Sequence, residues 1–416
     1  MFKTVQKSPF LTRLVDPFQP SREHAEAAYR FQSDARTWLV PALVGGGALG
    51  VSLVGWALDA HQFYISYLIG WVFCLSLALG AMFFVLIQHL TKARWSVVVR
   101  RLAESLGWSV PLLALLSIPI FFGIHDLYHW SHEDVALHDP IIAGKTAYLN
   151  VPFFMARLVI YLVVWTLIAY RLYSLSLRED LTGDPEIKFA QRKTSAWALP
   201  VMAVTVSFAA FDLLMSLDPH FFSTIFGVYF FAGAFWTVHA LLAFIGITLQ
   251  RGGRQLKGVI TREHYQDLGK FMFGFTVFWT YIAFSQYMLI WYGNLPEETI
   301  WYRHRLEHGW GWHSAMLLIL HFIVPFFVLL PRATKRSLPV LAVMAVWFFI
   351  MQWFDLHWLA MPALKPEHAG FHWLDFTCWI GLFGVFMGGY LYRLSRHSLV
   401  PQRDPYLGAS LRFQNT

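Results

Sequence analysis

Residues 64–90 read YISYLIGWVFCLSLALGAMFFVLIQHL, an apolar run without a single Lys, Arg, Asp or Glu. A run of about 20 apolar residues is long enough to cross the hydrocarbon core of a bilayer as a helix. Nine more runs of this kind lie before and after it in the sequence. The predicted spans are residues 37–58, 64–90, 107–124, 152–174, 195–217, 223–250, 268–292, 310–330, 338–361 and 372–394.

The composition agrees with an all-α integral membrane protein. The chain has 416 residues, of which 57% are hydrophobic and only 14% are charged. A transmembrane β-barrel would need short alternating segments, whereas these runs are continuous. The net charge of +7 does not require a nucleic-acid partner, because the cytoplasmic loops of membrane proteins are basic for topological reasons.

Lys and Arg almost vanish from every second connection between the spans. Of the 32 basic residues, 27 lie in the N-terminal segment, in the connections after spans 2, 4, 6 and 8, and in the C-terminal tail. The remaining connections carry only Lys145, Arg303, Arg305 and Lys365. By the positive-inside rule both termini are cytoplasmic. The predicted divisions are a cytoplasmic segment 1–36, a membrane domain 37–394 and a cytoplasmic tail 395–416.

Two halves of the chain resemble one another. Phe211-Asp212-Leu213 with Pro219 matches Phe354-Asp355-Leu356 with Pro362 at an offset of 143 residues. Ser66, Gly70 and Phe73 match Ser223, Gly227 and Phe230 with identical spacing. Repeats four spans apart run in the same direction through the membrane. The sequence therefore predicts two parallel four-helix bundles, spans 2–5 and 6–9, flanked by spans 1 and 10.

Ionisable residues inside predicted spans are candidate functional groups, because a charge in hydrocarbon is costly. Asp212 and Asp355 occupy equivalent repeat positions near the outer ends of spans 5 and 9. Either carboxylate is a candidate proton acceptor or a hydrogen-bond partner for a polar ligand. The alternative is a structural carboxylate that caps a neighbouring helix or pairs with Arg157. A quinone pocket near these outer ends would draw on Asp126, Arg157, Asp212 and Asp355.

Histidines extend the possible proton relay toward the middle of the membrane. His239 and His321 lie in spans 6 and 8, and His357 lies near the outer end of span 9. Histidine exchanges protons near neutral pH, which suits a relay. The alternative is a neutral histidine hydrogen-bonded to a neighbouring helix, or, for His357 and Asp375, solvation at the outer face. No catalytic residue, haem pair or metal-ligand pattern is expected from these positions.

Three segments carry a resemblance to a known family. They are Asp212-Leu213-Leu214-Met215-Ser216-Leu217-Asp218-Pro219-His220-Phe221-Phe222-Ser223-Thr224, Ser285-Gln286-Tyr287 through Asn294-Leu295-Pro296-Glu297-Glu298-Thr299, and Pro401-Gln402-Arg403-Asp404-Pro405-Tyr406-Leu407-Gly408-Ala409-Ser410-Leu411. The chain resembles, over essentially its whole length, the NrfD/polysulfide-reductase membrane subunits. The resemblance is strongest to the smaller of the two such subunits in bacterial alternative complex III.

The resemblance implies a subunit of a quinol:electron-acceptor oxidoreductase in the bacterial cytoplasmic membrane. The implied partners are a larger NrfD-like sister subunit, an iron–sulfur protein, c-type cytochromes, small membrane subunits and a terminal oxidase. The subunit itself is expected to be non-catalytic or to contact quinone, with no redox centre of its own. Menaquinone or ubiquinone and lipid are the implied non-covalent ligands.

The function predicted from the sequence is therefore support of quinol oxidation, with proton translocation as a further role. Two alternatives from other classes stay open. One is a secondary transporter built on parallel repeats, against which the spans show no broken pair at matching positions. The other is a passive scaffold that anchors extracytoplasmic cytochrome and iron–sulfur subunits through the acidic, His-rich outer loops.

Overall fold

The chain is a multi-pass helical membrane protein. The computed structural model describes residues 29–31, 34–252 and 255–415, and within these ranges ten helices are long and apolar enough to span a membrane. The same ranges contain no β-sheet, apart from a single bridge between Arg30 and Ser398. Most of the predicted segment 1–36, and four of the six basic residues counted there, lie outside the described residues.

Eight spans are continuous helices and two are built from shorter pieces. The continuous spans are α3 (Arg36–Leu58), α4 (Ala60–Leu90), α11 (Val151–Thr182), α12 (Glu186–Leu213), α13 (Phe226–Gly252), α14 (Arg262–Gly293), α19 (Leu338–Leu364) and α20 (Trp373–Arg396). The third span consists of α5 (Val97–Gly107), α6 (Val110–Leu116) and α7 (Ile118–Phe122). The eighth consists of α16 (Trp310–Met316), the π-helix Leu317–Ile323 and α17 (Val324–Leu329).

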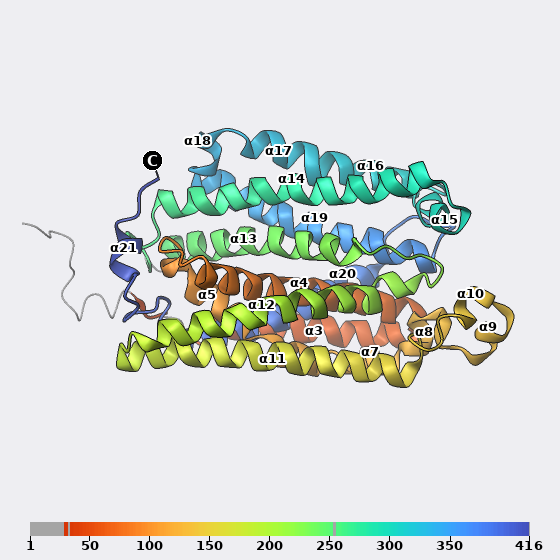
Figure 1. Cartoon of the computed structure of the whole chain (residues 1–416), viewed down its shortest axis with the longest axis horizontal. Helices are drawn as coiled ribbons and strands as arrows, with labels where there is room; N and C mark the ends of the chain where they lie inside the picture. Colours follow the sequence, from red (N-terminus) through yellow and green to blue (C-terminus); the bar gives the residue numbers. More distant parts are fainter. Residues whose placement is uncertain (1–28, 32–33, 253–254, 416) are drawn as a thin grey trace, which may run out of the picture.

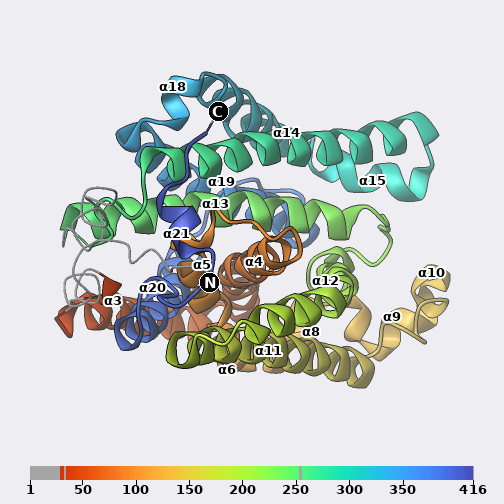
Figure 2. The same ribbon diagram turned by 60° about the vertical axis from the view of Figure 1, so that its left-hand side comes forward.

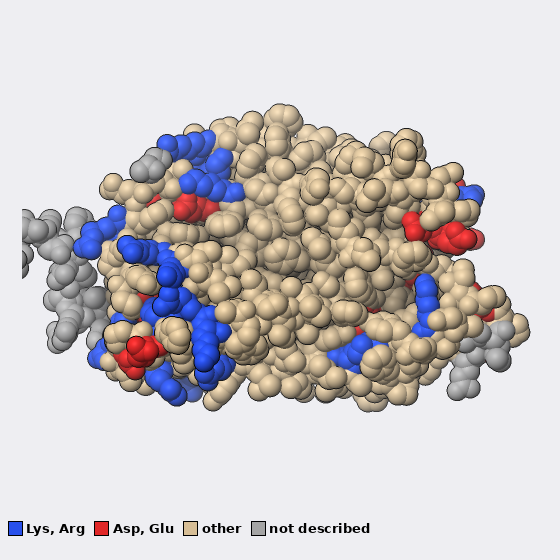
Figure 3. All heavy atoms as spheres, viewed as in Figure 1, with Lys and Arg blue, Asp and Glu red and all other residues tan. Residues whose placement is uncertain are grey.

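Short helices complete the connections at the two ends. They are α8 (Ile124–Leu127), α9 (Glu133–His138), α10 (Pro140–Ala143), α15 (Pro296–His304), α18 (Arg332–Lys335) and α21 (Leu407–Leu411). Figure 3 shows Lys and Arg gathered at the end of the molecule where α18, α21 and the C-terminus lie in Figure 1. We call this the basic end. The opposite end carries α9, α10 and α15 (Figure 1).

The helices form the two predicted four-helix bundles. In the first, α4 packs against α5 and α12, and α11 packs against α12, α5 and α6. In the second, α13 packs against α14 and α19, and α14 packs against α17. Contacts of α4 with α13 and α19, and of α12 with α13, join the bundles (Figure 2). The flanking helices α3 and α20 pack mainly on each other, and α20 also packs on α4.

The central position of α4 explains why residues 64–90 contain no Lys, Arg, Asp or Glu. Its apolar window is entirely buried inside the protein, whereas only 17% of the α3 window is buried. A helix that is hydrophobic on all sides belongs in a core, and the run of α4 from Tyr67 to Ile87 has no charged residue. The exposed apolar side chains of α3 instead suit contact with lipid.

Several predicted boundaries are wrong by about two and a half to three turns. The third span begins at Val97 rather than 107, and the fifth begins at Glu186 rather than 195. Both helices extend through charged residues that the prediction assigned to loops. Three of these residues, Arg100, Arg101 and Lys188, are neutralised by ion pairs with neighbouring carboxylates.

The repeat is also less regular than predicted. Ser66 lies inside α4, whereas its partner Ser223 precedes α13. Helix α12 ends at Leu213, before Pro219, whereas α19 continues through Pro362 to Leu364. Pro362 has no N–H to donate to the carbonyl four residues earlier, and α19 ends two residues after it. The two bundles therefore differ where Asp212 and Asp355 lie.

The close packing of α3 on α20 gives a test of this arrangement. A Cβ at Gly45 would lie 2.5 Å from the backbone nitrogen of Val385, whereas a Cβ at Gly46 would have no neighbour within 4 Å. We predict that Gly45→Ala lowers the free energy of unfolding by about 1–3 kcal/mol, because backbone must shift. Gly46→Ala should stabilise the helix by up to about 1 kcal/mol.

Thermal unfolding of the purified chain in detergent measures both variants. Equal midpoints for Gly45→Ala and Gly46→Ala would show that α3 does not pack on α20 as described.

Candidate functional site

Asp212 lies in the first bundle and is fully paired. Arg157 on α11 donates from Nε to Oδ2 and from Nη2 to Oδ1 of Asp212, each at 2.9 Å. The hydroxyl of Tyr161, one turn further along α11, donates to Oδ2 at 2.9 Å. We call Arg157, Tyr161 and Asp212 the Asp212 cluster. A bidentate Arg–carboxylate pair of this kind is among the stronger charged contacts in proteins.

Aromatic rings hold the arginine of this cluster in place. The Arg157 guanidinium lies 3.8 Å from the ring centre of Tyr148 and 4.3 Å from that of Phe153. Its Nη1 donates to the backbone carbonyl of Tyr148 at 2.9 Å. The pairing with Arg157, one of the alternatives left open by the sequence, is therefore present and well ordered. The Asp212 cluster has the character of a structural clamp between α11 and α12.

Asp355, at the equivalent repeat position, lies in very different surroundings. It is 1% exposed, and its Oδ1 accepts a hydrogen bond from the Tyr229 hydroxyl at 2.5 Å. Among the described residues no Lys, Arg or His forms an ion pair with it. The second bundle therefore buries a carboxyl group without a cation, which a membrane protein does at high cost.

His321 lies close to this carboxyl group, on the far side of an indole ring. Trp279 packs on the Tyr229 ring with centroids 5.4 Å apart, and on the His321 ring with centroids 3.7 Å apart. Trp236 covers the other face of His321 at 4.1 Å. Both ring nitrogens of His321 are buried without a hydrogen-bond partner. We call Asp355, Tyr229, Trp279 and His321 the Asp355 cluster.

The π-helix explains how His321 reaches this position. A π-helical turn holds one extra residue and rotates the side chains that follow, and such turns are frequent at functional sites. His321 lies inside the π-helical segment Leu317–Ile323. His239, another of the three predicted relay histidines, lies elsewhere in the bundle. Its Nδ1 is 2.6 Å from the carbonyl of Phe235, and its ring stacks on Phe271.

His357 is part of a third group, which starts two residues beyond Asp355 on α19. Its Nε2 lies 3.5 Å from Oδ2 of Asp375 on α20. Oδ1 of Asp375 accepts hydrogen bonds from Ser66 at 2.5 Å and from Gln62 at 3.0 Å. Asp375 is 1% exposed and His357 is fully buried, so solvation at the outer face is the wrong explanation for both. Their pairing across α19 and α20 replaces solvent.

A cavity of about 540 Å³ opens beside this pair. Asp375, Gln62 and Lys365 line it together with the aromatic ring of Phe371. Lys365 donates a hydrogen bond to Oε1 of Gln62. Gln62 could not be selected from the sequence, because its partners Asp375 and Lys365 lie more than 300 residues away along the chain. We call this cavity the Asp375 pocket.

The four predicted quinone-pocket residues do not form one site. Arg157 and Asp212 are in direct contact, but Asp355 lies in the other bundle. Asp126 lies on the short helix α8 and is half-buried, with no side-chain contact to the other three among the described residues. The Asp375 pocket is the better candidate for a polar headgroup, because it combines apolar walls with several polar groups.

A buried charge network lies at the basic end, and the sequence prediction missed it. Glu104 accepts from Nε of Arg100 and from Nε of Arg101, each at 3.1 Å. Lys188 lies 3.1 Å from Glu179, and Arg101 lies 2.8 Å from Asp180. The last member comes from the C-terminal tail: Asp404 accepts hydrogen bonds from both Arg100 and Lys188.

This network, which we call the basic-end network, contains three cations and four carboxylates. They are Arg100, Arg101, Lys188, Glu104, Glu179, Asp180 and Asp404. The prediction treated the three cations only as indicators of orientation. One signal was present in the sequence, because Glu104 follows Arg100 and Arg101 at the spacing of helical ion pairs.

The two ends of the membrane region thus hold separate polar groups, with apolar packing around His239 and His321 between them. Among the described residues no group of three or more His, Cys, Asp or Glu is placed to hold a metal ion. What the arrangement offers chemically is protonation and deprotonation of buried carboxyl and imidazole groups. Comparison with known proteins found no matching family model and no matching curated protein sequence.

The Asp212 cluster gives a stability prediction. Arg157→Met leaves the Asp212 carboxylate buried without its cation, which should lower the free energy of unfolding by about 3–5 kcal/mol. Adding Asp212→Asn to that variant removes the unpaired charge and should recover part of the loss. Thermal unfolding of the two variants in detergent measures this. A double variant no more stable than Arg157→Met would contradict a structural ion pair.

The tail gives a prediction that depends on pH. Burial raises the pKa of the Asp404 carboxyl, but Arg100 and Lys188 outweigh burial and hold that pKa below its ordinary value. The stabilisation is therefore present above the unfolded pKa of about 3.9 and is lost as the pH falls through the lower folded pKa.

We predict that Asp404→Asn releases the tail at neutral pH. Its opening free energy should fall by about 1.5–3 kcal/mol, the range for a hydrogen bond to a charged group. Amide hydrogen exchange over residues 397–415 measures the change. Wild-type exchange rates that stay constant between neutral pH and pH 3, after correction for intrinsic rates, would contradict the ionic attachment.

Proposed function

We propose that the chain is a membrane subunit of a bacterial quinol-oxidising respiratory complex of the alternative complex III type. Its own contribution in this proposal is proton movement through the second bundle. The ten spans, the two bundles and the three signature segments support this reading. The electrons would pass through partner subunits, namely the iron–sulfur protein and the c-type cytochromes, so this subunit needs no redox centre. The positive-inside rule places the basic end in the cytoplasm.

The observation that carries the proposal is the unpaired carboxyl group of Asp355. The internal repeat has a carboxyl group at the same position in each half, Asp212 and Asp355. Among the described residues, only Asp212 of these two has a cation beside it. The uncharged acid is the form that an apolar site tolerates at least cost, and the charged form gains a hydrogen bond from Tyr229. A group that can exist in both forms inside the membrane can take up and release a proton.

His321 supplies the next titratable group in this proposal. Its two nitrogens have no fixed partner, so either can accept or donate a proton when water enters the bundle. Trp279 lies between His321 and Tyr229, and its indole also approaches the Asp355 carboxyl group. A proton path through the second bundle would therefore use Asp355 and His321 as its two titratable stations.

The Asp375 pocket is the proposed place for contact with quinone. A quinone headgroup is flat and carries two carbonyl oxygens, which can accept from Lys365 or Gln62 while the ring packs on Phe371. Asp375 and His357 beside it could receive the protons that quinol releases on oxidation. The pocket lies at the opposite end from the basic-end network, hence on the proposed outer side of the membrane.

A matched pair of substitutions tests proton movement. In the assembled complex, reconstituted in liposomes, Asp355→Asn and Tyr229→Phe should lower the number of protons translocated per electron while quinol oxidation continues. Asp212→Asn and Tyr161→Phe, the corresponding changes in the first bundle, should lower thermal stability instead. Each variant is first checked for co-purification with its partner subunits.

Two outcomes would contradict the proposed function. An unchanged proton-to-electron ratio in both Asp355→Asn and Tyr229→Phe would remove the second bundle from any proton path. Isolation of the wild-type chain as a free monomer, without cytochrome or iron–sulfur partners, would overturn the assignment to such a complex.

A further inference from the structure

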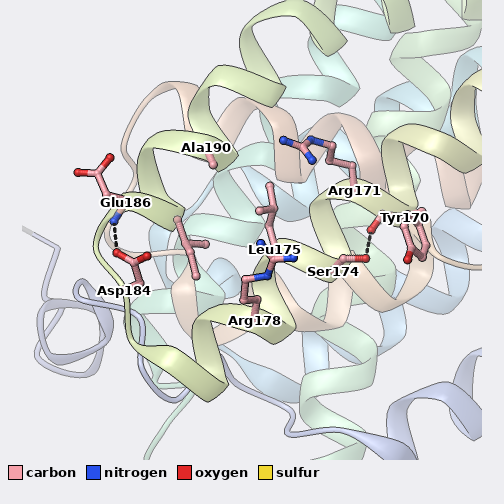
Figure 4. Close-up of a pocket in the computed structure, with 9 residues that line it drawn as sticks. Tyr170, Arg171, Ser174, Leu175, Arg178, Asp184, Glu186 and Ala190 are labelled. Carbon is pink, nitrogen blue, oxygen red and sulfur yellow. Dashed lines mark hydrogen bonds between the residues drawn. The ribbon is translucent and has the colours of Figure 1, made fainter.

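A cleft of about 380 Å³ lies between α11 and α12 near the basic end. Arg171, Ser174 and Arg178 line it from α11, and Ala190 lies opposite on α12, where its small side chain leaves room (Figure 4). None of these residues belongs to the Asp212 cluster, the Asp355 cluster or the basic-end network. The cleft therefore needs an explanation of its own.

The two arginines share one face of α11 and point into the cleft. They are seven residues apart, or about two helical turns, which separates their Cα atoms by roughly 10 Å. Both are exposed, and neither side chain forms an ion pair or hydrogen bond with any other described residue. Figure 4 shows both guanidinium groups turned toward the space beside Leu175.

Two acidic residues at the rim do not neutralise these arginines. Oδ1 of Asp184 accepts from the backbone nitrogen of Glu186 at 2.9 Å, which fixes it at the start of α12. The Glu186 carboxylate points away from the cleft (Figure 4). The cleft thus presents two unpaired guanidinium groups, whose fork geometry matches phosphate oxygens.

The surroundings of the cleft favour a lipid phosphate over one in solution. Helix α11 has 32 residues, about 48 Å of length, against a hydrocarbon core of about 30 Å, so its end with Arg178 extends into the headgroup region. On the same face, deeper in the membrane, Val163 and Leu167 are 50% and 60% exposed. These side chains offer a surface for acyl chains directly below the arginines.

We infer that this cleft binds the headgroup of an anionic phospholipid. Arg171 and Arg178 hold the phosphate oxygens, and the acyl chains lie along α11 over Leu167 and Val163. Basic pockets between membrane helices on the cytoplasmic side are known to recognise such headgroups.

The test compares two double variants of the full-length chain in neutral detergent. Native mass spectrometry, with phosphatidylglycerol or phosphatidylcholine added, counts bound lipids. For Arg171→Gln with Arg178→Gln, we expect roughly tenfold weaker binding of phosphatidylglycerol and unchanged binding of phosphatidylcholine. The control is Arg251→Gln with Lys257→Gln, which removes the same charge at exposed basic-end positions outside the cleft. It should stay within about twofold of wild type.

Three results would overturn the inference. Equal losses in the two double variants would mean diffuse attraction to the basic end, and no loss in the Arg171 and Arg178 variant would mean that the lipid binds elsewhere. Displacement of phosphatidylglycerol by millimolar inorganic phosphate would identify a site for a free anion instead. All four positions are exposed, so loss of folding is not expected to obscure the comparison.

Discussion

A charge buried among apolar helices must be neutralised by a partner or by a proton, and this constraint shapes the whole molecule. At the basic end, three cations are paired with four carboxylates in a network that no single helix could form. At Asp212, one arginine does the same work through two hydrogen bonds. Asp355 has no cation beside it among the described residues, only the hydroxyl of Tyr229 and the indole of Trp279. A proton is therefore the remaining means of neutralising it, which sets the second bundle apart from the first.

The fold was predictable because it rests on properties that act locally along the chain. Each span is an apolar run of sufficient length, and the alternation of Lys and Arg gives each run a direction. The starts of α5 and α12 were not predictable in this way. Arg100 and Lys188 read as loop residues, and only their contacts with Glu104, Glu179 and Asp404 make them helix residues. Glu104 lies on the same helix as Arg100, but Glu179 comes from α11 and Asp404 comes from the C-terminal tail.

At the candidate site, too, the sequence indicates where a residue lies but not which side chains surround it. The repeat correctly pairs Asp212 with Asp355 by offset, but it says nothing about what lies across the bundle from each. Arg157 is 55 residues from Asp212 and Tyr229 is 126 from Asp355, so neither contact follows from local spacing. The backbone also differs, because α12 ends at Leu213 whereas α19 continues to Leu364. Equivalent residues of a duplicated fold need not keep equivalent roles.

The irregular spans also distinguish the second bundle from the first. The first bundle has its irregular span in second place, as α5, α6 and α7, and the second bundle has its irregular span in third place, around the π-helix. These places do not correspond in the repeat, so neither irregularity is a property of the ancestral unit. The π-helix rotates His321 between Trp236 and Trp279, where a regular helix would present a different residue. The unneutralised carboxyl group and the distorted helix thus lie in one bundle. A buried carboxyl group without a cation and a distorted helix each lower stability. Their presence in the same bundle points to a functional role for that bundle.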